Sequence, residues 1–447
     1  CGITIDEGVS VGGTHTPYRQ SERKEIYRSY AMQLVESGNA YYAFDTAHQL
    51  EQQRKNAEEK KETFSYGSAT RMKLNNSLAL SVDEVKELLS KNVAYAIRLK
   101  IPENETITFT DLIRGVVSFD SNLVDDKVLL KSDGMPTYHL AHIVDDYLME
   151  ITHAIRGEEW LPSAPAHILI YRYLGLTAQM PHYAHLPLLL KPDGKGKLSK
   201  RDGDRLGFPV FPLEWKDPST GEVSSGYRES GYYPEAFVNM LAMLGWNPGT
   251  AQEIFNMNEL IAAFSLDHVH KAGARFDLEK TKWYNTQWML RQPNEAIAKR
   301  IKPMVATRTG ISADDVRLSD NYLTACVALL KPRVQFEKEM PEKGIYLFKA
   351  PSEFDQTVIS KKWKTEFISF FKMLSDEFMT LQDWSSQLAE QTFKTTAEKN
   401  NIKPGEVLQL FRVFVSGQAQ GVDLFPMIQL LGKDEVIKRL ETALKFV

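Results

Sequence analysis

The sequence has only two cysteines, Cys1 and Cys326, among its 447 residues. Two cysteines can form neither a disulfide framework nor a zinc site with four cysteine ligands, and sparing use of cysteine is typical of a reducing cytosol. No run of about 18 apolar residues is present, so we expect no transmembrane helix, and no segment has the pattern of a signal peptide. Hydrophobic residues make up 43% of the chain and charged residues 25%, which excludes a disordered or collagen-like protein.

Charge is unevenly divided along the chain, whose net charge is −4. From Lys271 onward there are 27 basic and 22 acidic residues, so this part carries +5 and the first 270 residues carry −9. A basic second half suits an anionic partner, but uneven surface charge without a function accounts for these numbers about as well. The length is sufficient for about three domains.

Hydrophobic patterning divides the chain into a mixed half and a helical half. Helical spacing predicts helices at 18–38, 45–64, 81–89, 140–148 and 164–174, and alternation predicts strands at 95–102, 107–110, 116–120, 127–130, 136–139 and 150–156. Strand–helix alternation around 135–190 predicts a parallel α/β sheet, and the strands at 95–130 are expected to form an insertion. From about Glu259 onward only helices are predicted, among them 258–264, 322–330, 363–374, 406–415 and 434–444.

The strongest chemical signal is a lysine-rich loop at residues 191–203, which follows the apolar run Leu186–Leu190. Gly194, Gly196 and Gly203 make the loop pliable, and three lysines and one arginine lie between them. At the carboxyl edge of a parallel sheet, such a loop would be a movable cationic clamp for phosphates, as nucleotidyl transfer requires. On composition alone, a solvated turn is the commoner explanation.

Within this loop, Lys197-Leu198-Ser199-Lys200-Arg201 resembles the Lys-Met-Ser-Lys-Ser signature of class I aminoacyl-tRNA synthetases. Further segments resemble one branch of that superfamily, the glutamyl-tRNA synthetases. In chain order they are 17–23, 134–141 (Gly-Met-Pro-Thr-Tyr-His-Leu-Ala) with 144–146, 155–160 (Ile-Arg-Gly-Glu-Glu-Trp), 185–188, 231–236 with 244–246, and 276–277 with 283–285. Each segment alone is weak, but the ordered set, from about residue 12 to the C-terminus, is specific.

The resemblance implies a Rossmann-like α/β nucleotide-binding catalytic domain with an inserted α+β acceptor-binding region, followed by an all-helical anticodon-binding half. The expected boundaries are 1–40 for the remainder of the first catalytic half, 41–133 for the insertion, 134–190 for the second catalytic half, 191–285 for the lysine loop and stem-contact region, and 286–447 for the anticodon-binding domain. The resemblance also implies a monomeric cytoplasmic ligase, without membrane association, that uses ATP and Mg²⁺ to activate L-glutamate and transfers it to the terminal adenosine of tRNA(Glu).

The resemblance assigns the lysine loop and its neighbours to ATP. Lys200 is expected to contact the ATP phosphates, with Lys197 as its companion. Both ammonium groups would be catalytic, because they would stabilise charge as the glutamate carboxylate attacks the α-phosphate. Ser199, Glu159 and Trp160 are expected to lie near ATP, although Trp160 as a hydrophobic loop anchor is the simpler alternative.

The resemblance assigns three other residues to glutamate. Arg156 is expected to pair with the amino acid, because a guanidinium fork matches a carboxylate with two parallel hydrogen bonds. Tyr138, on a predicted strand, and His142, on the helix that follows, are expected to face the same pocket. Taken alone, each has a commoner explanation: a core tyrosine, a surface arginine and a packed histidine.

Two other functions stay open at this stage. A glutaminyl-tRNA ligase shares the nucleotide fold, although in that branch the second half is built of β-barrels. A catalytically inactive relic would bind tRNA without ATP–pyrophosphate exchange. The segment 361–364 (Lys-Lys-Trp-Lys) has the chemistry to stack an unpaired base, but a solvated helix start explains it slightly better.

The sequence departs from the family pattern in two places. Some members hold zinc with cysteines in the acceptor-binding region, but 41–46 (Tyr-Tyr-Ala-Phe-Asp-Thr) contains none, so we predict no structural zinc. The His-Ile-Gly-His signature of the family is absent too. We expect it to precede Cys1 in a longer protein, with a strand and a helix of at least ~30 residues, because a chain truly starting at Cys1 would not activate glutamate.

Overall fold

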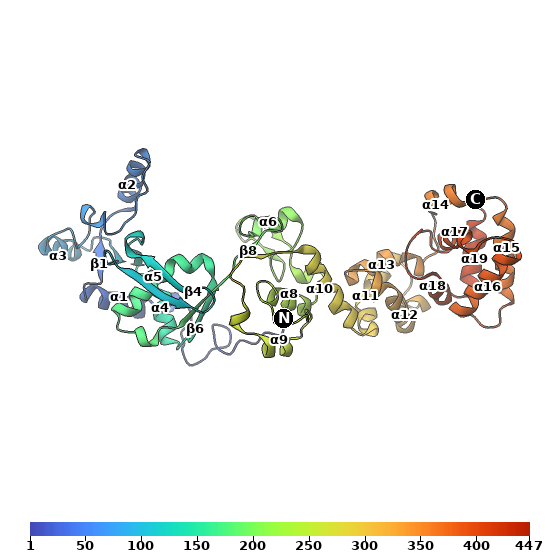
Figure 1. The fold of residues 1–447 in the computed structure, drawn as a ribbon, viewed down its shortest axis with the longest axis horizontal. Helices are drawn as coiled ribbons and strands as arrows, with labels where there is room; N and C mark the ends of the chain where they lie inside the picture. Colours follow the sequence, from blue (N-terminus) through green and yellow to red (C-terminus); the bar gives the residue numbers. More distant parts are fainter.

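The computed structural model describes the backbone of residues 1–447 and all side chains except those of Lys200, Arg201 and Asp204. The molecule is elongated, with a mixed α/β part at one end, a middle part, and a helical part at the other end (Figure 1). An α/β half followed by a helical half is therefore present as predicted. Among the described residues, none of the helices combines the length and apolar character needed to span a bilayer.

Two sheets build the mixed part. Three antiparallel strands lie in the order β1-β2-β5, with β1 at Ala40–Ala43, β2 at Ala96–Leu99 and β5 at Val128–Leu130. Four further strands lie in the order β4-β3-β7-β6, with β4 at Gly115–Asp120, β3 at Thr106–Asp111, β7 at His182–Leu186 and β6 at His153–Gly157. Strands β3, β7 and β6 run parallel, and β4 pairs with β3 in the antiparallel sense.

Strands β3 and β4 share this sheet with β6 and β7, whereas the sequence analysis assigned them to a separate insertion. The pattern of β3 explains the difference, because Ile107, Phe109 and Asp111 alternate on its buried face. Asp111 pairs with Tyr183 of β7. The three-stranded sheet, with helices α2 (Ala47–Glu59) and α3 (Val82–Ser90), is the part that lies outside the four-stranded sheet.

Helices α1 (Lys24–Glu36), α4 (Tyr138–Leu148) and α5 (Ala164–Tyr173) pack on these sheets and share one apolar core with them. Arg23 Nε donates a hydrogen bond of 2.9 Å to Asp145 of α4, and the Tyr27 hydroxyl donates to the same carboxylate. Arg23 also donates to the Pro17 carbonyl at 2.8 Å. This anchor keeps the preceding chain out of a regular α-helix, so α1 begins at Lys24 and not at residue 18 as predicted.

The strands predicted at 127–130 and 136–139 meet in a tight hairpin around Gly134, since Leu130 bridges Pro136 in the antiparallel sense. The strand predicted at 136–139 ends at that bridge, because α4 already begins at Tyr138. Tyr138 is thus the first residue of a helix and not part of a strand. Strand β6 begins at His153, later than the predicted residue 150, because Glu150 has a left-handed backbone (φ 54°) just after α4.

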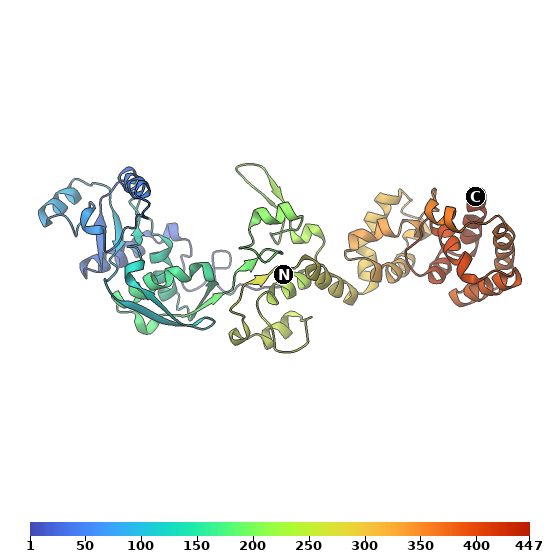
Figure 2. The same cartoon turned by 45° about the horizontal axis from the view of Figure 1, so that its top comes forward.

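The middle part starts with β8 (Leu189–Leu190), which pairs in parallel with β11 (Ala274–Arg275) in a sheet of its own. The lysine loop therefore follows the carboxyl end of a strand in a parallel pair, as predicted, and this pair is separate from the four-stranded sheet. Next come α6 (Lys200–Leu206) and the hairpin of β9 (Trp215–Lys216) and β10 (Val223–Ser224), which projects from the body in Figure 2. The remaining helices are α7 (Tyr227–Ser230), α8 (Pro234–Ala242), α9 (Met257–Ala263) and α10 (Leu278–Arg291).

Beyond Arg275, the described residues form helices and connecting segments without a strand. The helices that follow α10 are α11 (Asn294–Thr309), α12 (Asp320–Leu330), α13 (Met340–Lys343), α14 (Gln356–Lys362), α15 (Phe367–Thr380), α16 (Ser386–Lys399), α17 (Pro404–Ser416), α18 (Leu424–Leu431) and α19 (Lys433–Ala443). They share one core that is rich in phenylalanine.

One predicted helix of this half starts too early. The helix expected at 363–374 begins at Phe367, and Trp363 instead ends α14. The Trp363 ring packs against Phe371 and Phe414, with centroid distances of 6.2 and 5.6 Å. Because this ring lies against the core, the segment 361–364 is neither a helix start nor a free stacking platform for a base.

Candidate functional site

Three polar side chains lie at one edge of the sheet, each near the carboxyl end of one of three parallel strands. Asp111 ends β3, His185 lies near the end of β7, and Arg156 lies near the end of β6. The β6–β7 register pairs Arg156 directly with His185. The carboxyl ends of parallel strands are the usual place for ligand sites in α/β folds. The first turn of α4 brings Tyr138 and His142 to the same place, as the contacts of Arg156 demonstrate.

Arg156 is held by three histidines and one tyrosine, and by no carboxylate. Its Nε donates to His185 Nε2 at 3.0 Å, and its Nη1 lies 3.1 Å from His167 Nδ1, 3.2 Å from the Tyr138 hydroxyl and 3.3 Å from His142 Nε2. Its Nη2 is buried and has no hydrogen-bond partner among the described residues. A buried, unpaired cationic donor is costly, so two N–H groups are available for an anionic ligand. The sequence-predicted residues Tyr138, His142 and Arg156 are therefore in mutual contact.

Asp111 and His185 form a fully buried pair behind Arg156. The Asp111 Oδ2 lies 2.6 Å from His185 Nδ1, and both side chains are 0% exposed. Burial favours the neutral acid, but hydrogen bonds donated by the Arg114 amide, the His185 ring and the Ile113 amide outweigh it and lower the pKa of Asp111. Burial lowers the pKa of His185, although Asp111 opposes this effect. The pair is therefore a carboxylate and a neutral imidazole.

Two more histidines lie in the same cluster. Since His167 Nδ1 accepts from Arg156, its proton is on Nε2, which lies 3.1 Å from His139 Nδ1. Burial is the main cause that lowers the pKa of His139 to about 4 and the pKa of His167 well below its usual value. Both rings are thus neutral at physiological pH. His142 Nδ1 lies 3.1 Å from Asp146 Oδ2, but that oxygen lacks the geometry of a hydrogen bond.

Aromatic rings border the cluster on one side. The Tyr138 and Trp160 rings are tilted against each other with centroids 4.2 Å apart, and both side chains are 37% exposed. Trp160 lies on the 3₁₀ helix Glu158–Ser163 that directly follows β6. Two half-exposed rings beside a polar cluster give a flat apolar surface, which suits stacking of a ligand as well as packing of the loop.

The lysine loop reaches this 3₁₀ helix. Lys197 Nζ lies 2.5 Å from Glu159 Oε1, and this contact lowers the pKa of Glu159. The Ser199 hydroxyl donates to Asp202 at 2.6 Å in a capping box at the start of α6, and this bond is the main cause that lowers the pKa of Asp202 to about 2. The predicted residue Lys200 has its side chain outside the described residues.

The loop glycines have more specific roles than pliability. Gly194 and Gly196 have φ values of 75° and 84°, in the left-handed region that favours glycine. Gly203 lies inside α6, where an added Cβ would be 2.0 Å from Val210 Cγ2. The first two glycines are required by backbone conformation, and Gly203 by close packing.

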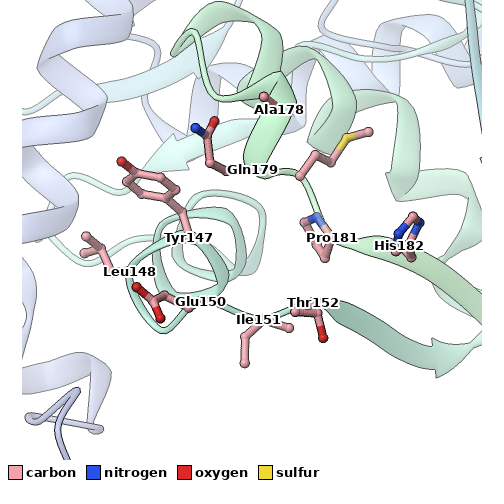
Figure 3. A pocket seen from close by; sticks show the side chains of 10 residues that line it. Tyr147, Leu148, Glu150, Ile151, Thr152, Ala178, Gln179, Pro181 and His182 are labelled. Carbon is pink, nitrogen blue, oxygen red and sulfur yellow. The ribbon is translucent and has the colours of Figure 1, made fainter.

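The cavity drawn in Figure 3 lies at the opposite ends of the same strands. It measures about 610 Å³ and is lined by the segment Tyr147–Thr152 and by residues 178–182, ahead of β6 and at the start of β7. None of the sequence-predicted site residues lines it. The polar cluster at the carboxyl ends, and not this cavity, therefore agrees with the predicted site.

Sequence reasoning missed four members of the cluster: Asp111, His139, His167 and His185. His185 is the first residue of one family-like segment, and His139 lies within another. The resemblance therefore marked both positions but gave neither residue a role. Asp111 and His167 carried no such signal. Among the described residues, no group of three or more His, Cys, Asp or Glu side chains is arranged to hold a metal, and Cys326 is buried in the helical part. The absence of zinc stays a prediction.

Comparisons with known proteins follow the division of the fold. The profile of the catalytic domain of class I tRNA synthetases (E and Q) matches residues 1–283, and that of an anticodon binding domain matches residues 296–444. The chain is 48% identical over 445 residues to the glutamate–tRNA ligase of Cytophaga hutchinsonii, covering 99% of this chain and 85% of the relative. It is also 48% identical to the glutamate–tRNA ligase of Christiangramia forsetii, covering 99% and 86%.

Solved structures agree with these relatives. The crystal structure of a glutamate tRNA ligase from Elizabethkingia meningosepticum, in complex with its amino acid, matches with a TM-score of 0.92 at 43% identity, covering 99% of this chain and 87% of that chain. The glutamate-tRNA synthetase of Elizabethkingia anophelis gives the same values. The resemblance inferred from the motifs is confirmed, and the glutamyl branch is favoured over the glutaminyl branch.

Proposed function

Because the chain belongs to the glutamate–tRNA ligases, a family of class I aminoacyl-tRNA synthetases, we propose that it activates L-glutamate with ATP and transfers the glutamyl group to the terminal adenosine of tRNA(Glu). The main support for this proposal is the Arg156 Nη2, which has no hydrogen-bond partner among the described residues and lies at the carboxyl edge of the sheet. A cation that makes no contact with a carboxylate of its own chain keeps its charge for a carboxylate ligand.

Glutamate activation needs a carboxylate and an α-phosphate side by side. In this proposal Arg156, Tyr138 and His142 hold glutamate. The contact between Lys197 and Glu159 supports an ATP site next to it, since it links the lysine loop to the helix that follows β6. Lys197 and Lys200 stabilise the charge that forms on the phosphate oxygens during attack, and Ser199 and Trp160 contribute to the same ATP site.

Mg²⁺ enters this proposal together with ATP. Magnesium usually keeps several waters and binds through one or two carboxylates plus substrate phosphates. In this proposal the ion arrives with ATP on the phosphate oxygens and its own waters, since Glu159, the carboxylate next to the lysine loop, is paired with Lys197. When bound, the ion would neutralise phosphate charge.

The two ends of the elongated molecule take the two ends of tRNA(Glu) in this proposal. The three-stranded sheet with α2 and α3 receives the acceptor end. The helical part receives the anticodon, because the chain from Lys271 onward has a net charge of +5 whereas the first 270 residues carry −9. We further propose that the enzyme acts as a monomer in the cytoplasm.

The test is ATP–pyrophosphate exchange, measured in the presence of tRNA(Glu) with and without glutamate. The proposal predicts exchange that depends on glutamate and is lost in Arg156→Lys, because a lysine cannot reproduce the Nε and Nη1 bonds while leaving donors free. Control measurements of tRNA binding should give equal affinity for both proteins. Tight tRNA binding without any exchange in the unaltered protein would favour the inactive relic instead.

A further inference from the structure

Asp111, His185 and Arg156 form a linear relay across three adjacent strands. The strand order β3-β7-β6 places them side by side, each at the carboxyl end of its strand. Asp111 Oδ2 is 2.6 Å from His185 Nδ1, and His185 Nε2 is 3.0 Å from Arg156 Nε. The middle member contacts both of its neighbours through opposite ring nitrogens, so the sheet itself sets the spacing of the relay.

The contacts of Asp111 determine the tautomer of His185. The carboxylate accepts hydrogen bonds from the amides of Ile113 and Arg114 at 2.9 and 2.8 Å, and from the His185 amide at 3.1 Å. An ionised carboxylate can only accept, so His185 carries its proton on Nδ1. Its Nε2 then has a lone pair, which is what the Arg156 Nε–H needs.

The other histidines around Arg156 lack such a fixed support. His142 faces Asp146 at 3.1 Å without hydrogen-bond geometry, and His167 is supported only by His139, another neutral ring. His142 and His167 share Nη1 with the Tyr138 hydroxyl, so this nitrogen has three possible acceptors for two protons. Arg156 Nε, in contrast, has a single partner, the fully buried His185, and that ring is hydrogen-bonded to the Asp111 carboxylate.

We propose that Asp111 and His185 are positioning residues for glutamate binding: the carboxylate fixes the His185 tautomer, and His185 fixes Arg156 so that its free Nη2 meets a substrate carboxylate. This inference rests on the proposed function for its ligand. A carboxylate placed directly on Arg156 would compete with the substrate for the guanidinium. An imidazole between them holds the side chain and leaves its charge to the ligand.

Asp111→Asn tests the relay with almost no change in shape. The side-chain oxygen of the amide still accepts from the Ile113 and Arg114 amides, but its NH₂ group now faces His185 Nδ1. The ring must move its proton to Nε2, where it opposes the Arg156 Nε–H. We expect the KM for glutamate to rise about 10-fold or more, while the KM for ATP changes less than about twofold.

His185→Gln is the rescue variant. The glutamine side-chain oxygen can accept a hydrogen bond from Arg156 with either aspartate or asparagine at position 111. Adding Asp111→Asn to His185→Gln should therefore change the KM for glutamate by less than about a further twofold. His182→Gln is the matched control, because His182 lies at the other end of β7, opposite His153 of β6, and is exposed. It should leave both KM values unchanged.

The tautomer is read directly by nitrogen NMR of protein labelled with ¹⁵N-histidine, with the His185 signal identified by its loss in His185→Gln. A proton on Nδ1 in the unaltered protein, moved in Asp111→Asn, supports the relay. A proton on Nε2 in the unaltered protein overturns it. An unchanged glutamate KM in Asp111→Asn, or an equal rise in both KM values, also overturns it, because the pair would then have no positioning role.

Failure of the proposed function is distinguishable from failure of the relay. If the unaltered protein shows no glutamate-dependent exchange, the proposed function fails together with the glutamate part of this inference. The NMR measurement, made without any substrate, still decides whether Asp111 sets the tautomer of His185.

Discussion

Glu159→Gln is predicted to lower the KM for ATP, because Glu159 is paired with the Lys197 ammonium group that the ATP phosphates need. Lys197 Nζ lies 2.5 Å from Glu159 Oε1, and the two side chains are 55% and 41% exposed. Ion pairs this exposed contribute about 0.2–1 kcal/mol. If the pair must open for ATP to bind, removing the carboxylate should lower the KM for ATP by a factor of about 1.4–5.

The assay is ATP–pyrophosphate exchange at saturating glutamate, with the KM for glutamate measured in parallel and expected to stay constant. Lys197→Met is the control background. Once the lysine is gone, Glu159→Gln should have no further effect on ATP, since the two changes remove the same contact. A rise of tenfold or more in the KM for ATP would refute the reasoning, because Glu159 would then bind ATP or its magnesium and not restrain Lys197.

Four further predictions concern stability. Burial lowers the pKa of His139 to about 4 from 6.5, so the folded state takes up its proton later than the unfolded state as the pH falls; stability should drop by about 2 kcal/mol between pH 7.5 and 5. His139→Gln should flatten the pH dependence of the first thermal transition by that amount, and an unchanged slope would contradict the buried neutral ring. Arg71→Met should lower the free energy of unfolding by about 3–5 kcal/mol in thermal or denaturant unfolding, because it leaves Asp126, whose side chain is 0% exposed, without its cation. EDTA should not change the melting temperature of the unaltered protein, and a lower melting temperature would argue for a structural metal. Arg23→Met should speed amide hydrogen exchange throughout Lys24–Glu36, since it removes the bond to Asp145 that ties α1 to α4; slow exchange in the variant would mean that apolar packing alone holds the helix.

Local chemistry made part of the site predictable from the sequence. Tyr138 and His142 are one helical turn apart, so any helix starting near residue 138 brings them to one face. Arg156 ends a strand that the apolar pattern marks. The ordered segments then assigned these three residues to one pocket, and the structure places them in contact. Their roles stay predictions.

Long-range pairing made the rest unpredictable. Asp111 and His185 are 74 residues apart, and their contact depends on β3 lying beside β7, which the alternation of β3 alone does not specify. Strand β8, which precedes the lysine loop, was not predicted as a strand, since two residues have almost no sequence signal. Trp363 was misread because helical spacing continues across the break between α14 and α15.

The most direct test of the central claim is charging of tRNA(Glu) with labelled glutamate and, separately, with labelled glutamine. If Arg156 takes the side-chain carboxylate, glutamate is attached and glutamine, which carries a neutral amide in its place, is attached at least about 100-fold less efficiently in kcat/KM. Equal charging with both amino acids, or charging with glutamine alone, would contradict the assignment of Arg156 and of the family's amino acid to this protein.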